Sequence, residues 1–465
     1  GQGFPDFPCD RELISQVNAA MLADHNQYPP MVGITELRQG VSQKISTLYG
    51  NEYDSDTEIT ITAGGTQGIM TAILCCVSPG DEVVIIEPAY DSYRPSIELA
   101  GGKTIVVSLI ANRDGDGCVN SYSIPWDDLE KVINPKTRLI IINTPHNPTG
   151  MVWQKSDLER LANLVRNTNA LILSDEVYEH MVYAPNQHWS AAHFDGLAAR
   201  AFIVSSFGKT YHVTGWKVGH VAAPAPLTQE FRKVHQFNVF TVNTPMQHGL
   251  ARYLANPAPY LELPAFYQRK RDLFRDGLAA TRLKLLPSEG SYFQCVDISN
   301  LKVPEKNLSE ADFCKWLTSE IGVAAIPLSA FYADGFDQRV VRFCYAKKDE
   351  TLQAALARLA AEQETAREMR RRAELELSAT QAGTARADAE QSAAQATNES
   401  LAAENALREL RAADRARPVS ASSQAGPGLH MSPRWPRIFG IAGLAVAALL
   451  GVMLWRSEGR AGTGG

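Results

Sequence analysis

A lysine stands at the end of an apolar run in residues 205–219, SSFGKTYHVTGWKVG. Most lysines are exposed, so an isolated Gly-Lys pair would indicate only a surface loop. Lys209, however, follows the run AFIV at residues 201–204, and a second lysine, Lys217, comes eight residues later. An amine that is desolvated at the end of a strand loses its proton more easily and can form a Schiff base with a carbonyl carbon. This segment therefore indicates carbonyl chemistry.

An acidic residue ends another apolar run, ALILSDEVYE at residues 170–179. A buried carboxylate such as Asp175 is costly unless a cation or strong hydrogen-bond donors pair with it. A ring nitrogen that must stay protonated is such a partner. Tyr178, three residues further on, points the same way if a helical turn begins there.

Three further runs end in residues that could contact a flat, phosphorylated ring. The segment TAGGTQGI opens a helix whose N-terminus, at Gly65, Thr66 and Gln67, could bind a phosphate. Tyr90 in EPAYDSY could stack on the ring, and the amide of Asn147 in NTPHNPTG could donate to a phenolate oxygen. Each has a simpler interpretation: an empty helix start, a core aromatic residue or a turn-forming asparagine.

One molecule, pyridoxal 5′-phosphate, requires all of these groups together. It needs a phosphate cradle, an aromatic plate, an amide donor, a carboxylate for its ring nitrogen and an amine for its aldehyde. Lys217 then serves the phosphate as a point charge and Ser206 as a hydroxyl donor. Their coincidence in strand order favours a cofactor site over separate structural roles.

The elements that position these residues are read from seven apolar runs between residues 58 and 225. The runs are EITITA, EVVIIE, KTIVVSL, RLIIINT, ALILSD, AFIVSS and VGHVAA. Their continuous hydrophobicity predicts strands covered on both faces, and helical stretches alternate with them. We therefore expect an α/β fold with a mainly parallel seven-stranded sheet sandwiched by helices. Ligand groups gather at the carboxyl ends of such strands.

Composition divides the chain into five regions. Residues 1–50 are expected to contribute to a small domain and a dimer, residues 51–280 to form the large cofactor-binding domain, and residues 281–360 a smaller α+β domain. Residues 361–436 hold an Ala/Glu/Arg-rich spacer, expected to be helical or disordered, and a Pro/Ser/Gly linker.

The region 437–456 contains an uncharged apolar run at residues 438–455. Its length is near the lower limit for a transmembrane helix, which predicts a membrane anchor. Arginines are slightly more frequent before the run than after it, so the long N-terminal part is expected on the cytoplasmic side.

Composition also disfavours several classes of protein. The chain has 465 residues, 45% of them hydrophobic and 21% charged, which is typical of a globular protein. A net charge of −6 disfavours a nucleic-acid partner. Its seven cysteines form no CxxC pair and its ten histidines no HExxH motif, so we expect no metal site and a reducing compartment. The first residue is not methionine and no apolar signal segment follows it, so we expect a piece of a longer chain.

Six segments together resemble the fold-type I, class I and II aminotransferases: TAGGTQGI, EPAYDSY, NTPHNPTG, LSDEVYEH, SSFGKTYHVTGWKVG and VRFCYAK. The resemblance covers about residues 1–360 and is strongest to the methionine and kynurenine aminotransferase group. It implies that Lys209 forms the aldimine with the cofactor and that Asp175 pairs with the pyridine nitrogen. It also implies that Asn147 and Tyr178 bond the phenolic oxygen and that Tyr90 stacks on the ring.

The resemblance assigns the remaining site residues as well. Arg342 would clamp the substrate carboxylate together with Asn147, and Gly3 would belong to a loop on the substrate side. Tyr28 resembles a tyrosine that reaches the phosphate of the neighbouring subunit, which implies a homodimer with shared sites. The phosphate would be held by Gly65, Thr66, Gln67, Ser206 and Lys217.

The implied activity moves the amino group of an apolar, thioether or aromatic L-amino acid to a 2-oxo acid. Two alternatives stay open. The same carbanion could lead to cleavage of a C–S bond by β-elimination, and the chain could be a membrane-tethered, non-catalytic interaction protein. The second is disfavoured because no residue of the cofactor set is lost. The segment from residue 361 onward has no counterpart in the family.

Overall fold

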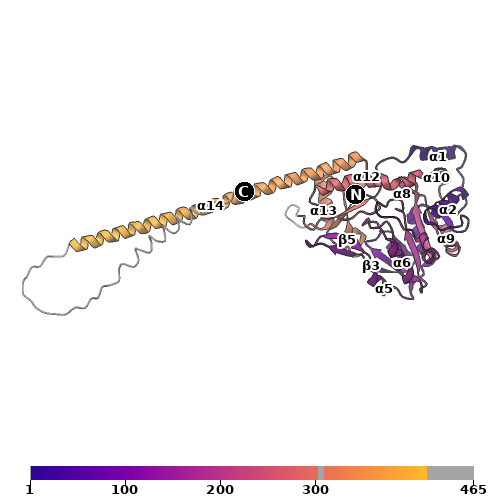
Figure 1. Ribbon diagram of the computed structural model, residues 1–465, viewed down its shortest axis with the longest axis horizontal. Helices are drawn as coiled ribbons and strands as arrows, with labels where there is room; N and C mark the ends of the chain where they lie inside the picture. Colours follow the sequence, from indigo (N-terminus) through magenta and orange to yellow (C-terminus); the bar gives the residue numbers. More distant parts are fainter. Residues whose placement is uncertain (1, 302–307, 416–465) are drawn as a thin grey trace, which may run out of the picture. The chain divides into compact units, whose positions relative to one another are not determined.

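The computed structural model describes residues 2–301 and 308–415 (Figure 1). The chain up to Leu375 forms one compact unit, and the residues from Glu376 on form a second. The first unit contains a seven-stranded sheet, a four-stranded sheet and a two-stranded hairpin with several hydrophobic clusters, and all of the predicted site residues belong to it.

A seven-stranded sheet forms the centre of the larger domain and confirms the predicted α/β fold. Its strands pair in parallel except for β9, which runs antiparallel to both of its neighbours, so that the sheet is mixed. All seven apolar runs became strands of this sheet. Their order is β1 (Ile59–Thr62), β9 (Gly219–Ala222), β8 (Ala201–Ser206), β7 (Leu171–Asp175), β6 (Thr137–Asn143), β2 (Glu82–Glu87) and β3 (Lys103–Ser108).

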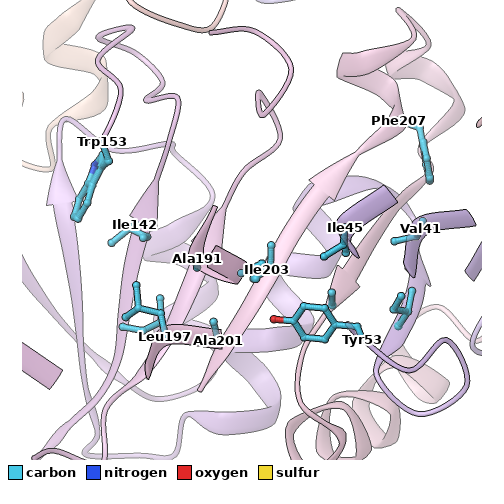
Figure 2. Close-up of a cluster of buried hydrophobic side chains, with 14 of the residues drawn as sticks. Val41, Ile45, Tyr53, Ile142, Trp153, Ala191, Leu197, Ala201, Ile203 and Phe207 are labelled. Carbon is cyan, nitrogen blue, oxygen red and sulfur yellow. The ribbon is translucent and has the colours of Figure 1, made fainter. Parts of the chain in front are cut away.

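Both faces of this sheet are buried, which explains why the runs are continuously apolar. Alternate residues of one strand enter different cores: Val84 and Ile86 pack with one cluster and Val83 and Ile85 with the other. Figure 2 shows part of the first cluster. The helices of the domain are α3 (Gly64–Cys76), α4 (Tyr93–Leu99), α5 (Trp126–Val132), α6 (Lys155–Val165), α7 (Asp195–Ala198), α8 (Phe207–Thr210), α9 (Ala225–Asn238) and α10 (Thr244–Leu254).

A second, antiparallel sheet forms the smaller domain. Its strands are β10 (Lys284–Leu285), β11 (Phe293–Asp297), β13 (Val340–Cys344) and β12 (Ile326–Pro327), in that order. Its core combines aliphatic side chains with several aromatic ones, among them Tyr267, Tyr292 and Phe343. The helices of this part are α11 (Ala258–Leu261), α12 (Leu263–Ala279), α13 (Glu310–Trp316) and the beginning of α14 (Asp349–Arg415). Shorter helical turns cover Leu317–Ile321 and Leu328–Phe331 here, and Ala191–His193 and Thr214–Trp216 in the larger domain.

The sequence did not predict the hairpin of β4 (Ile110–Arg113) and β5 (Val119–Ser123). It joins the two domains, because the main-chain N–H of Val119 donates to Asp297 Oδ2 at 2.8 Å and Lys284 pairs with Asp114. Its strands mix exposed and half-buried positions with mainly polar residues, and this pattern carries no strong strand signal.

The N-terminal segment contacts both domains. Helices α1 (Arg11–Leu22) and α2 (Thr35–Tyr49) pack against α10. Before them, Phe4 O accepts from Lys347 Nζ at 2.6 Å and Asp6 Oδ1 from the main-chain N–H of Lys348 at 2.5 Å. These bonds hold the first residues against the smaller domain.

In the second unit, residues from Glu376 to Arg415 continue α14, and the side chains described there are exposed. Within residues 2–301 and 308–415 no helix is both long and apolar enough to cross a membrane. The run at residues 438–455, predicted as a membrane anchor, lies outside the described residues, as does the linker before it.

Candidate active site

A cavity of about 440 Å³ lies at the carboxyl ends of the central strands, beside the smaller domain. It brings together residues that are up to 340 positions apart, because the carboxyl ends of the parallel strands, the N-terminal segment and the smaller domain all contribute to its lining. The predicted residues that line it are Gly3, Gly65, Thr66, Tyr90, Asn147, Asp175, Tyr178, Ser206, Lys209, Lys217 and Arg342.

Asp175 ends β7 and is only 3% exposed. Tyr93 Oη donates to its Oδ2 at 2.6 Å, and the main-chain N–H of Val177 donates to Oδ1 at 3.3 Å. Burial raises the pKa of Asp175 to about 6, although these donors act in the opposite direction. Among the described residues it forms no salt bridge, so a bound cation would stabilise its charged form.

Lys209 lies in α8, directly after β8. Its Nζ donates to Tyr292 Oη at 2.8 Å and to Gly3 O at 3.3 Å. Desolvation lowers the pKa of Lys209 to about 8, so a substantial fraction of this amine is neutral near that pH. A neutral, buried amine is a competent nucleophile and base.

The anion-binding end of the cavity is built from backbone. Gly64 has a φ of +79° at the start of α3, and a Cβ added at Gly65 would lie 2.9 Å from Val177 Cγ1. A side chain at Gly64 would therefore strain the backbone, and one at Gly65 would fill the approach to the first N–H groups of the helix. Ser206 and Lys217 line the same cavity and add a hydroxyl and a positive charge.

Two predicted residues do not line the cavity. The side chain of Gln67 accepts from the main-chain N–H of Ala63 at 2.8 Å and contacts His235 Nδ1 at 3.1 Å, which leaves only its main-chain N–H for an anion. Tyr28 is 81% exposed and packs against Phe240. A role for Tyr28 at this cavity would require a second subunit.

Arg342 comes from β13, and its guanidinium lies between the rings of Phe293 and Phe331, 3.9 and 4.8 Å from their centroids. Its Nη1 donates to Asn147 Oδ1 at 2.6 Å. Its Nε is buried and has no hydrogen-bond partner among the described residues. A fixed, planar donor with an unused N–H suits a carboxylate.

Sequence reasoning missed several residues of the site. Tyr93 was within the quoted segment EPAYDSY but received no role, although its hydroxyl holds Asp175. Asn143 ends β6, where its Nδ2 donates to Asp175 O at 2.8 Å and its Oδ1 accepts from the N–H of Asn147 at 2.7 Å. The sequence signal that could have identified both residues is the position of a polar side chain at or shortly after the end of an apolar run.

The arrangement fits pyridoxal 5′-phosphate on three observations. In the described part of the chain a buried carboxylate forms no salt bridge, a cradle of glycines is open where a Cβ would intrude, and a lysine amine with a lowered pKa lines the same cavity. Asp175 would hold the ring nitrogen, Lys209 the aldehyde carbon, and the start of α3 with Ser206 and Lys217 the phosphate.

Comparisons with known proteins agree with this fit. The sequence profile of the family described as aminotransferase class I and II matches residues 1–359. The chain is 45% identical over 359 residues to a methionine aminotransferase of Escherichia coli K12, covering 77% of this chain and 90% of the relative. It is 35% identical over 374 residues to kynurenine–oxoglutarate transaminase 3 of Rattus norvegicus, covering 76% and 82%.

The fold is also similar to solved structures. A crystal structure from Escherichia coli, whose report identifies a methionine aminotransferase function, aligns with a TM-score of 0.73 at 45% identity. The alignment covers 77% of this chain and 92% of that one. The fold and the local geometry of the cavity therefore lead to the same family.

The contact between Tyr93 and Asp175 generates a prediction. Tyr93→Phe removes a donor from the charged carboxylate, so the pKa of Asp175 rises above about 6 and cofactor binding weakens at a higher pH than in wild type. Because such a bond contributes about 1.5–3 kcal/mol, we expect at least about tenfold weaker cofactor binding at pH 6. Cofactor titrations between pH 5 and 8 measure this.

The matched control is Tyr53→Phe, since the buried hydroxyl of Tyr53 has no partner among the described residues and does not line the cavity. Cofactor affinity should then follow the wild-type pH dependence. Identical pH profiles for the Tyr93 variant and wild type would contradict the assignment of Asp175 to the ring nitrogen.

Proposed function

The chain belongs to the class I and II aminotransferases, and from this premise we propose that it moves the amino group of an apolar, thioether or aromatic L-amino acid to a 2-oxo acid. It is a pyridoxal 5′-phosphate-dependent transferase. The observation that carries the proposal is the meeting, in one cavity, of buried Asp175, the weakly basic amine of Lys209 and the unpaired Nε of Arg342.

The cofactor, when bound, supplies an electron-withdrawing ring that stabilises negative charge on the substrate α-carbon. Asp175 keeps the ring nitrogen protonated because its carboxylate is buried and needs a cation. Tyr90 would pack on the ring face, while Asn147 and Tyr178 would donate to the phenolic oxygen. The phosphate is held by Gly65, Thr66, the main-chain N–H of Gln67, Ser206 and Lys217.

Lys209 binds the cofactor covalently and later acts as the base. Its amine removes the proton from the substrate α-carbon and holds it at Nζ as an ammonium. A pKa near 8 suits a group that must accept a proton and later release it. A substantial fraction of the amine is neutral and can accept the proton, and the ammonium that results is acidic enough to give it up.

Arg342 binds the substrate α-carboxylate, and Asn147 fixes one end of the guanidinium. The walls beside Arg342 are apolar, formed by Ile326, Phe293 and Phe331, which suits a thioether or aromatic side chain. The described residues that line the cavity include no second arginine, so a donor with a side-chain carboxylate would lack a bidentate partner there. Relatives named for methionine and kynurenine support the same substrate class.

Two subunits share each site in this proposal. Tyr28 packs edge-on against Phe240, and both rings are exposed, as are Leu22 and Phe237. Phe237 is 87% exposed, and a subunit interface that covers it would remove this apolar surface from water. A homodimer that buries this face would let Tyr28 reach the phosphate of its partner.

We also propose that the run at residues 438–455 anchors the catalytic domain to a membrane, with that domain on the cytoplasmic side. The support is its sequence alone, since 18 residues without a charge span about 27 Å as a helix.

Replacing Lys209 tests the proposed function. Lys209→Ala should lower turnover of methionine with a 2-oxo acid by about 10³-fold or more, because both the covalent link and the base are lost. After borohydride reduction, mass spectrometry should find the cofactor on residue 209 of wild type. Lys233→Ala is a matched control on the exposed side of α9 and should keep full turnover. Turnover retained without Lys209 would refute the assignment.

An amino-donor panel separates transamination from β-elimination. With methionine, kynurenine, phenylalanine, aspartate and cystathionine as donors, we expect 2-oxo acid formation from the first three, and little from aspartate. Release of ammonia and pyruvate from cystathionine as the main reaction would favour the C–S lyase instead.

Shared sites predict that two defective subunits rescue each other. Tyr28→Ala and Lys209→Ala, each much less active alone, should on co-expression regain about a quarter of wild-type activity, because half of the dimers are mixed and each has one intact site. Co-expression without recovery would place Tyr28 and Lys209 of one site in the same subunit, or Tyr28 outside the site.

The anchor predicts a difference in fractionation. The full chain should sediment with lipid vesicles, whereas a chain that ends at Arg415 should stay in the supernatant. Equal partition of the two chains would remove the anchor and leave the catalytic proposal unaffected.

A further inference from the structure

Tyr292 contacts the amine of Lys209, and the proposed function gives it no role. It directly precedes β11, is fully buried, and accepts a hydrogen bond from Lys209 Nζ at 2.8 Å. Its ring is held edge-on against Tyr178, with 5.2 Å between centroids, and against Phe293, with 4.9 Å. The position of its hydroxyl is therefore fixed by packing.

The single hydrogen of this phenol is used elsewhere. Tyr292 Oη donates to Gly3 O at 2.5 Å, so the oxygen presents only lone pairs to Lys209. Gly3 O also accepts from Lys209 Nζ, at 3.3 Å. Both neighbours of the amine in this corner are thus acceptors.

The number of hydrogens on the amine then determines its orientation. A neutral lysine amine has two N–H bonds and one lone pair. If Tyr292 Oη and Gly3 O take the two N–H bonds, the lone pair is directed away from both acceptors, and Lys209 lines the cavity in which a substrate would bind. A base must present its lone pair, not an N–H, to the carbon whose proton it removes.

Gly3 can take part because it has no side chain. A Cβ at this position would lie 2.8 Å from Phe293 Cζ, so a larger residue would move the segment or the ring. The neighbouring contacts of Phe4 and Asp6 with Lys347 and Lys348 hold the same segment in place. Three parts of the chain, around residues 3, 209 and 292, therefore meet at one nitrogen.

We propose that Tyr292, with the carbonyl of Gly3, is a positioning residue that orients the amine of Lys209 so that its lone pair faces the substrate α-carbon. This inference rests on the proposed function, in which that amine removes the α-proton. It adds a residue from the smaller domain to the proton-transfer machinery.

The contact also affects the charge of Lys209. Apart from burial, the groups that act on the pKa of this amine are Cys344, Asp175, Arg342 and Lys217. An ammonium donates stronger hydrogen bonds than an amine, so losing the acceptor at Tyr292 disfavours the charged form. In Tyr292→Phe the pKa of Lys209 should therefore fall further below its ordinary value.

The first test uses the holoenzyme. Tyr292→Phe keeps the ring and should lower kcat for methionine by about 10- to 100-fold, because a misplaced base loses its alignment, while KM stays within about twofold. The deuterium isotope effect with α-deuterated methionine should increase, since proton removal becomes slower. Tyr267→Phe is the matched control, because the buried hydroxyl of Tyr267 has no partner among the described residues and its ring packs beside Tyr292.

The second test uses the protein without cofactor. Mass spectrometry measures how fast an amine-reactive reagent labels Lys209 at each pH from 6 to 10. The labelling rate should reach half of its maximum at a lower pH in Tyr292→Phe than in wild type or Tyr267→Phe. Gly3→Ala, which displaces the shared carbonyl, should lower kcat in the same way. It keeps the inference testable if the Tyr292 variant is unstable.

The outcomes are distinct. Wild-type kcat, isotope effect and labelling midpoint in Tyr292→Phe would overturn the inference, while inactive Lys209→Ala would still support the proposed function. A wild-type protein that turns over no amino donor would refute the proposed function. The labelling midpoints alone would then decide whether Tyr292 holds the amine.

Discussion

The site depends on a buried carboxylate that forms no salt bridge with any residue in the described part of the chain. Asp175 ends a central strand, is almost inaccessible to solvent and is supported by one phenol and one main-chain N–H. Burial of a charge is unfavourable unless an opposite charge arrives, so this position favours a ligand with a protonated ring. The same burial lowers the basicity of Lys209, so in the proposed function one property of the cavity prepares both the partner of the ring nitrogen and the base.

A second buried charge lies behind this site and is satisfied by the protein itself. Lys44 of α2 and Glu179, just after Tyr178, form an ion pair of 2.7 Å whose side chains are 5% and 3% exposed. Burial alone would raise the pKa of Glu179, but the ammonium of Lys44 holds it well below its usual range. Ser205 and Tyr49 also donate to this carboxylate. The network ties α2 to residues at the ends of β7 and β8, which are close in sequence to Asp175 in β7 and Lys209 in α8.

Local sequence was sufficient to predict the strands of the central sheet and most of the residues that line the cavity. Strands buried on both faces read as continuous apolar runs, and the residues that follow them share one edge of the sheet. Asp175, Asn147 and Lys209 could therefore be selected without a structure. The antiparallel direction of β9 could not, because a short apolar run is the same in either direction.

Other features depend on contacts between distant residues. Tyr292 has no chemical signal in its own segment, since its partners are residues 3 and 209. Gln67 was correctly placed at a helix start, but the direction of its side chain depends on His235, which belongs to another helix. The stacking of Phe331 on Arg342 likewise joins two segments of the smaller domain that only its folding brings together.

The protonation state of the bound ring tests the central claim most directly. Nitrogen-15 NMR of the protein loaded with ring-labelled cofactor reports whether that nitrogen carries a proton. We predict a pyridinium signal that persists above pH 8 in wild type and a neutral pyridine signal in Asp175→Asn. A neutral ring nitrogen in wild type at pH 7 would contradict the account.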